Sequence, residues 1–286
     1  MIGDKPSGVK AHLPVLYPAI MLGLFFIIPF AIMVVVSFFQ RQLGGFYNPV
    51  FDLNNYKNLL TPLFGRVLVF SLFLSGLSAA VCVLLGFPFT YFLTRMRRRA
   101  QVIWLIFLLS VLSLSEVIIG FAWSLLLSRT AGISNLFVWL GLLEAPVSWS
   151  PSFWALLIGM CYIAFPYTVL VLYPPLSRLD PNLPEAALTL GASPVRTFFT
   201  VVVGALRNAI VAVFIMVFVF TLGAYLLPQI LGRPQHWTLS VLITDQAIYQ
   251  SNMPMAAAMA IFFMMVSLVL VVLTTLLGKE KRASTA

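Results

Sequence analysis

Glu116 is the residue whose type and position most directly suggest chemistry, because it interrupts the apolar run 101–128 with a carboxylate. A charged side chain at the centre of a membrane-spanning helix costs roughly 2.5–3.5 kcal/mol on insertion scales, so it should face a bundle interior and have a partner. Two roles stay open for it. Glu116 is either a negative contact for a cationic substrate or a structural hydrogen bond or ion pair to a neighbouring helix or a partner subunit.

Three more side chains could contact such a substrate. Trp123 follows Glu116 at i+7 and shares its helical face, and an aromatic face beside a carboxylate suits an organic ammonium group. Tyr225 lies one turn before Pro228, where an irregular backbone could line a cavity. Asp245 precedes the last apolar run of the sequence. The alternative interpretations are an interfacial anchor for Trp123 and a solvated turn for Asp245.

The sequence lacks the residue sets that covalent catalysis or a resident metal ion requires. Cys82 and Cys161 both lie in apolar stretches and form no CxxC pattern. His12 and His236 have no carboxylate or cysteine at ligand spacing. There is no Walker A loop and no GxSxG sequence. We therefore predict no catalytic residue, no metal site and no cofactor held by this chain.

The composition indicates a chain that is solvated by lipid. Of its residues, 61% are hydrophobic and 9% are charged, whereas a soluble domain carries roughly 25% charged residues. This difference excludes a soluble enzyme and a secreted disulfide scaffold. Six apolar runs each reach the length of about 20 residues that a membrane-spanning helix needs. They are 13–39, 67–94, 101–128, 152–177, 209–232 and 255–277. We predict an all-α transmembrane fold with a single domain over 1–286.

The basic residues predict the orientation of these spans. Of the 17 Lys and Arg residues, 12 lie on the side that holds both termini and 5 lie on the other side. The positive-inside rule then places both termini in the cytoplasm. The cluster Arg95–Arg99 is expected to anchor this topology at anionic lipid headgroups, and its spacing matches no nucleic-acid-binding module. The run 13–39 is longer than the 7–15-residue core of a signal peptide, so we expect an uncleaved span.

The longest connection on the predicted cytoplasmic side, 178–208, has the signals of a folded segment. A helix can begin at Asp180–Pro181, with an aspartate cap and a proline at the first helical position, or one turn later at Pro184–Glu185. Gly191 falls where a left-handed C-terminal cap is expected. Ser193–Pro194 then starts a second helix by the same capping logic. Two short helices at an angle are predicted.

Within this connection, nine consecutive residues resemble the EAA loop of the permeases of ABC importers. They are Glu185-Ala186-Ala187-Leu188-Thr189-Leu190-Gly191-Ala192-Ser193. In that family the loop docks into a groove on a cytoplasmic ATPase and transmits its closure to the membrane spans. The resemblance implies ATPase coupling for Glu185, Ala186, Ala187, Gly191, Ala192 and Ser193. The alternative is an ordinary capped surface helix.

Other segments fit the same family, and together they cover most of 13–278. They are Leu53–Tyr56, Gly132–Asn135, Phe165–Pro166 and Gly223–Gly232. The chain looks most similar to the B-type membrane subunit of spermidine/putrescine importers. This resemblance implies a six-span type I ABC-importer permease fold with a cytoplasmic coupling-helix loop, in the bacterial inner membrane. It also implies import of a polyamine or related organic cation by alternating access.

The resemblance further implies several partners. They are a second permease subunit, two cytoplasmic ATPases that bind ATP and Mg²⁺, and an extracytoplasmic substrate-binding protein. Relatives in the same group transport iron, opines, thiamine or phosphonates, so these substrates remain alternatives. A self-contained secondary transporter is a more distant alternative, because it predicts duplicated or inverted halves and ionisable relays. A membrane protein without a transport path is another.

Overall fold

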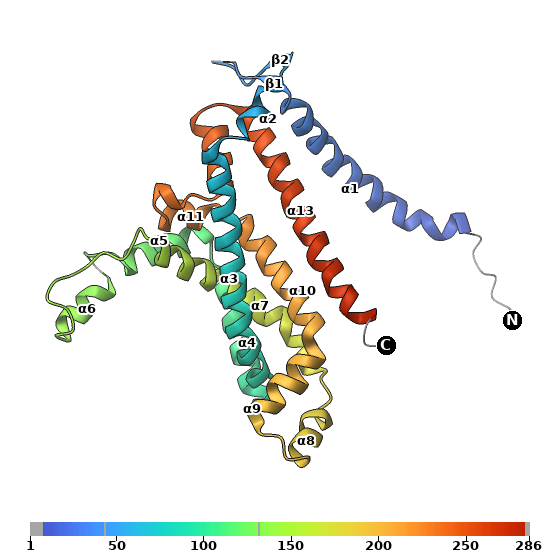
Figure 1. The fold of residues 1–286 in the computed structure, drawn as a ribbon, viewed down its shortest axis with the longest axis vertical. Coiled ribbons are helices and arrows are strands. Elements are labelled where there is room, and N and C mark those ends of the chain that lie inside the picture. The colour runs from blue at the N-terminus through green and yellow to red at the C-terminus, as the bar shows by residue number, and fades with distance from the viewer. Residues whose placement is uncertain (1–7, 43, 131, 284–286) are drawn as a thin grey trace. The chain divides into compact units, whose positions relative to one another are not determined.

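The computed structural model describes residues 8–42, 44–130 and 132–283 (Figure 1). The predicted domain 1–286 also includes 1–7, 43, 131 and 284–286, which lie outside the described residues. The chain divides into two compact units. One unit comprises Met1–Thr61 with Ile243–Met264, and the other comprises Pro62–Leu242 with Met265–Ala286. The last helix, α13 (Met253–Ala283), contributes its first part to one unit and its second part to the other.

Three helices form the centre of the larger unit. They are α3 (Pro62–Arg95), α7 (Phe153–Ser177) and α10 (Val203–Leu222), and each packs against the other two (Figure 1). The buried side of α3 carries the small residues Ser71, Ser75, Ser78 and Ala79, which let helix backbones approach closely in lipid. The hydroxyl of Thr221 on α10 lies 3.4 Å from the Ser75 carbonyl and donates to it.

The third predicted span, 101–128, is not one straight helix. It consists of α4 (Arg98–Leu112) and α5 (Glu116–Leu126), whose axes differ by 95° across the break between them. Three exposed residues, 113–115, form that break, and Ser113 and Ser115 can hydrogen-bond locally in competition with a helix. The short helix α6 (Ile133–Trp139) follows α5.

The fifth predicted span, 209–232, also differs from the structure. The helix runs without a gap from Pro194 to Leu222 and ends there. The remaining residues form a separate short helix, α11 (Leu226–Leu231), which packs against α5 and α7. Proline at position 228 is tolerated because it lies within the first turn of α11, where its missing N–H is not needed.

The connection after α11 contacts the central helices α3 and α7 through ring packing and a hydrogen bond. It contains η2 (Pro234–His236), where the His236 ring lies 5.8 Å from Phe70 and 6.1 Å from Phe153 between centroids. Burial, and secondly the charge of Arg233, lower the pKa of His236, so the neutral ring can accept the Arg233 N–H at its Nδ1. The next helix, α12 (Leu239–Thr244), begins with a 2.7 Å hydrogen bond from the Leu239 N–H to the Ser71 hydroxyl.

The smaller unit contains α1 (Gly8–Val36), an antiparallel pair of strands β1 (Phe39–Gln40) and β2 (Asn48–Phe51), α2 (Asn54–Asn58) and the π-helical turn η3 (Asp245–Tyr249). Asn55 holds the turn between α1 and β1. Its buried side-chain amide donates to the carbonyls of Ser37 and Phe39, at 3.0 and 2.9 Å. Free carbonyls at a helix end need such partners.

Within the described residues, four helices are long and apolar enough to cross a membrane. The bent pair α4–α5 would be a fifth, and α1 has a shorter apolar stretch, Ile20–Val36. The predicted all-α transmembrane fold is confirmed, with the third span bent rather than straight.

The packing of α11 generates a stability prediction. A Cβ atom at Gly159 of α7 would lie 2.5 Å from Cδ1 of Leu231, which is fully buried on α11. We expect Gly159→Ala to destabilise the purified protein by about 1–3 kcal/mol, because an overpacked core must shift. The measurement is thermal unfolding in detergent.

Gly76→Ala on α3 is the matched control. Among the described atoms, none lies within 4 Å of a Cβ built at Gly76. The same substitution there should be neutral, or should stabilise α3 by roughly 0.5–1 kcal/mol through lower chain entropy. Equal unfolding temperatures for the two variants would show that α11 does not pack tightly on α7.

Candidate functional site

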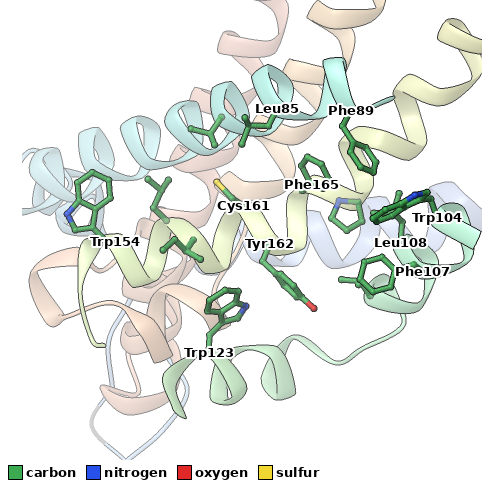
Figure 2. A pocket seen from close by; sticks show the side chains of 15 residues that line it. Leu85, Phe89, Trp104, Phe107, Leu108, Trp123, Trp154, Cys161, Tyr162 and Phe165 are labelled. Atoms are coloured by element: carbon green, nitrogen blue, oxygen red, sulfur yellow. The ribbon is translucent and has the colours of Figure 1, made fainter. Parts of the chain in front are cut away.

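An aromatic cavity of about 570 Å³ lies in the larger unit, where α4 and α5 diverge from α3 and α7 (Figure 2). Its walls include three tryptophans, Trp104 of α4, Trp123 of α5 and Trp154 of α7. The bend between α4 and α5 creates this space, because a straight third span could not contribute both Phe107 and Trp123 to the same wall.

The side chains around the cavity interlock through their ring edges. Trp123 and Tyr162 meet edge to face with centroids 5.6 Å apart (Figure 2). Phe89 of α3 contacts Trp104 at 5.4 Å and Phe165 of α7 at 5.5 Å in the same geometry. Of the described residues that line the cavity, none is charged. The cavity can therefore hold apolar groups or bind an organic ammonium through ring faces, but it supplies no carboxylate.

The structure places Glu116 at a helix end and not at a helix centre. Glu116 is the first residue of α5, half-buried, directly after the break that follows α4. The positive end of the α5 dipole favours a carboxylate at this position. Among the described residues, those that line the cavity include Trp123 but not Glu116. The expectation of a carboxylate deep within a continuous span is therefore wrong, because residues 113–115 end the helix first.

The two other proposed contact residues also lie outside this cavity's described lining. Tyr225 immediately precedes α11, and its carbonyl accepts the Gln229 N–H at 3.1 Å. Asp245 begins η3 in the smaller unit, where the Gln250 side-chain amide donates to its carboxylate at 2.6 Å. The Arg41 guanidinium in turn donates to the Gln250 carbonyl. Asp245 is therefore part of a local polar network.

Sequence reasoning missed most of the cavity. Trp104, Trp154 and Phe165 stand in apolar runs, where a bulky aromatic residue is ordinary core or interface. The signal that could have drawn attention to them is the presence of three tryptophans in two neighbouring runs, Trp104 and Trp123 in 101–128 and Trp154 in 152–177. Their convergence depends on which helices pack together.

The second candidate region is the segment 180–199, which the sequence predicts to couple to an ATPase and which we call the coupling segment. It contains α8 (Asn182–Thr189) and α9 (Pro194–Thr197), in agreement with the two predicted helices. The Asp180 carboxylate accepts the Asn182 N–H at 3.0 Å, and the Ser193 hydroxyl accepts the Arg196 N–H at 3.3 Å. Ser193 therefore caps α9 as predicted, whereas α8 begins at Asn182 with Pro181 as its N-cap, so Asp180 lies one position before the cap position expected for it.

Gly191 ends α8 in the left-handed conformation, with φ +87°. Its N–H donates to the Leu188 carbonyl, and the Ala192 N–H donates to the Ala187 carbonyl, each at 3.0 Å. This pair of bonds is the Schellman motif. It reverses the chain within a few residues and sets the angle between α8 and α9.

The outer side of the coupling segment exposes apolar side chains. Leu183, Leu188, Leu190 and Val195 are all exposed, Leu190 to 88%. Glu185 and Ala186 are exposed beside them, whereas Ala187 and Ala192 are half-buried. Large apolar side chains exposed within one short segment are candidates for contact with a protein partner.

Comparison with known proteins agrees with these features. Residues 67–283 match the family described as "Binding-protein-dependent transport system inner membrane component". The chain is 30% identical over 242 residues to the spermidine/putrescine transport system permease protein PotB of Escherichia coli (strain K12), covering 84% of this chain and 87% of that protein. The corresponding PotB of Haemophilus influenzae is 27% identical over 237 residues, with 83% of each chain covered.

A more distant relative is the putative ferric transport system permease protein FbpB 1 of Haemophilus influenzae, which is 28% identical over 58% of this chain and 26% of its own length. Among solved structures, a bacterial ABC transporter involved in the import of alginate has a TM-score of 0.77 at 17% identity, covering 95% of this chain and 97% of that chain. That likeness supports the fold. The chain belongs to the family of inner-membrane components of binding-protein-dependent transport systems, the permeases of ABC importers.

Proposed function

We propose that this permease moves polyamines, or closely related organic cations, into the bacterial cytoplasm. The observation that carries this proposal is the 30% identity to a spermidine/putrescine permease, which extends over 84% of this chain and 87% of the relative. The aromatic cavity supports it. Ring faces attract organic ammonium groups, whereas hydrated metal cations prefer oxygen and nitrogen ligands, and the described cavity walls offer almost none.

In the proposed assembly this chain pairs with a second, different permease subunit. Two cytoplasmic ATPases bind ATP and Mg²⁺, and an extracytoplasmic binding protein delivers the substrate. This chain hydrolyses nothing. Closure of the ATPases displaces the coupling segments, and the permeases change from inward-open to outward-open. Both termini and the coupling segment lie in the cytoplasm.

The exposed apolar side chains of α8 form the proposed docking surface for the ATPase. Leu190 and Leu188 supply buried area in the contact, and Glu185 offers an acceptor to a basic residue of the partner. The Schellman turn at Gly191 joins α8 to α9. A displacement of α8 is therefore passed on to the helix that continues into α10.

Glu116 supplies the negative charge that the cavity lacks. It lies at the start of α5, while Trp123 of the same helix lines the cavity. We propose that a cation meets Glu116 at the bend and the aromatic faces within the cavity. Tyr225 and Asp245 remain candidates for contacts elsewhere on the path.

The proposed function is tested with the complete transporter in proteoliposomes. The two permeases, the ATPases and the binding protein are reconstituted, and ATP-dependent uptake of labelled spermidine and putrescine is measured. Uptake that requires the binding protein and ATP supports the proposal. Uptake of ferric ion, thiamine or a phosphonate in place of both polyamines would identify a different substrate.

Replacing Gly191 should separate the permease from its ATPase. Gly191→Arg forces a bulky cation into a left-handed backbone position at the docking surface, at a cost of roughly 1–3 kcal/mol for the backbone alone. We expect at least a ~10-fold loss of copurified ATPase. A loss of ~1.4 kcal/mol in binding free energy already raises the dissociation constant tenfold.

Gly141→Arg is the control for Gly191→Arg. Gly141 also has a positive φ, +71°, and none of the described atoms lies within 4 Å of a Cβ built there. The Gly141→Arg variant introduces the same kind of backbone strain outside the coupling segment, so the ATPase should remain bound to it. Normal ATPase copurification and transport with Gly191→Arg would contradict the proposed coupling role.

The proposed orientation predicts the sidedness of cysteine labelling. In a background with Cys82 and Cys161 replaced by alanine, cysteines introduced at Arg97 and Ser193 should react with a membrane-impermeant maleimide only from the cytoplasmic side. Cysteines at Lys57 and Asn252 should react only from outside, because the positive-inside rule assigns these positions to opposite faces. Labelling at position 193 from outside in intact cells contradicts the orientation.

Removing the charge of Glu116 should reduce transport more than assembly. Glu116→Gln keeps the shape and hydrogen-bonding capacity of the side chain. We expect transport per assembled complex to fall by about tenfold, since a hydrogen bond to a charged group contributes roughly 1.5–3 kcal/mol. Labelled spermidine uptake and the amount of complex are measured in one preparation.

Glu144→Gln is the matched control for Glu116→Gln, because Glu144 is exposed in the connection before α7. It should leave transport per complex unchanged. If Glu116→Gln instead lowers assembly and each remaining complex transports at the wild-type rate, the role of Glu116 is structural.

A further inference from the structure

The ring of Phe198 joins the coupling segment to α3. Phe198 begins η1 (Phe198–Val202), one turn of π-helix between α9 and α10. Its ring centroid is 5.0 Å from that of Tyr91 and 5.6 Å from that of Phe87, and both partners are buried on α3. The neighbouring Phe199 is 64% exposed. Consecutive phenylalanines therefore have opposite environments, and only Phe198 packs toward the centre of the unit.

Tyr91 is held from its other side as well. The guanidinium carbon of Arg95, the last residue of α3, lies 3.9 Å from the Tyr91 ring centroid, which is the geometry of a cation–π contact. A cleft of about 210 Å³ beside this pair is lined by Leu179 and Pro181, in the connection that leads into α8. The end of α3 thus shares a cleft with the start of the coupling segment and contacts Phe198 near the end of that segment.

The π-helical turn lies at this contact. The helix that includes α9, η1 and α10 runs from Pro194 to Leu222, and η1 interrupts its regular i→i−4 bonding. A π-helical turn inserts one residue and locally widens the helix, and such turns are frequent at functional sites. Because α8 packs against both α9 and η1, a displacement of α8 reaches this turn before it reaches α10.

We propose that Phe198, packed against Phe87 and Tyr91, is the positioning residue that transmits displacement of α8 to α3. This inference rests on the proposed ATPase coupling of the segment. Phe198 packs against two rings of α3, and in this mechanism it acts through α3 and not through a contact with the ATPase. Interlocked ring edges resist sliding because they are close-packed, and α3 moves with η1 when the ATPases close.

The test uses the complete transporter, with both permeases, the ATPases and the binding protein in proteoliposomes. Phe198→Ala and Tyr91→Leu should retain the bound ATPase but lower transport per complex at least fivefold. Stimulation of ATP hydrolysis by the loaded binding protein should be lost, and more ATP should be hydrolysed per solute transported. The ring-preserving variants Phe198→Tyr and Tyr91→Phe should restore both quantities to within twofold of wild type.

Phe220→Ala is the matched control. Phe220 lies on α10 and packs against Tyr167 of α7 with centroids 4.6 Å apart, so its loss removes a comparable ring contact away from η1. It should lower transport only in proportion to the amount of complex, with an unchanged ratio of ATP to solute.

The outcomes separate this inference from the proposed function. If the wild-type complex shows no ATP-dependent uptake, the proposed function and the inference both fail. If the wild type transports and Phe198→Ala does so equally well per complex, only the inference fails. If Phe198→Ala does not assemble, Phe198→Leu replaces it, because leucine keeps most of the volume without the ring edge. Assembly failure of both variants would assign Phe198 a structural role and overturn the inference.

Discussion

Close contact between α3 and α7 is the constraint on which the rest of the larger unit depends. In lipid there is no hydrophobic driving force between helices, so they associate through tight packing of small residues and through hydrogen bonds. At Gly86 of α3, an added Cβ would lie 2.8 Å from Cγ2 of Thr168 on α7. The Cys82 thiol donates to the Cys161 carbonyl in the same contact, at 3.6 Å. With these helices fixed together, α10 packs against both.

The aromatic cavity follows from the same arrangement. Helix α4 packs on α7, while the axis of α5 is turned by 95° from that of α4 and α5 is held by α11. Gly120 allows this, because a Cβ there would lie 2.8 Å from Cδ1 of Ile230 on α11. The space between these two helices and the α3–α7 pair is lined by aromatic rings and aliphatic side chains.

Helix α3 also connects the two functional regions. Phe89 lines the cavity and Tyr91 packs against Phe198. Two residues along a helix correspond to about 200° of rotation, so these rings point to nearly opposite sides of α3. A tilt or rotation of this end of α3 changes the cavity wall and the contact with the coupling segment together. Under the proposed mechanism, this is how a movement driven by ATPases alters the substrate path.

The sequence by itself determined the lipid environment, the helical fold and the coupling segment. Composition and the length of apolar runs are sufficient for the first two, because every backbone polar group in lipid must be bonded within its own segment. The caps at Gly191 and Ser193 are local interactions between residues at most a few positions apart, so short patterns predict them.

Only the tertiary structure decided where the third and fifth spans break and which rings surround the cavity. Residues 113–115 and 223–225 are as apolar or as small as many residues inside continuous helices, so hydropathy does not distinguish them. Both breaks depend on tertiary packing. Helix α11 packs against α5 at Gly120 and against α7 at Gly159. The same reason applies to Glu116 and Trp123. Their spacing of seven places them on one helical face, but only the packing of α5 on α7 determines that Trp123 reaches the cavity while Glu116 remains at the bend.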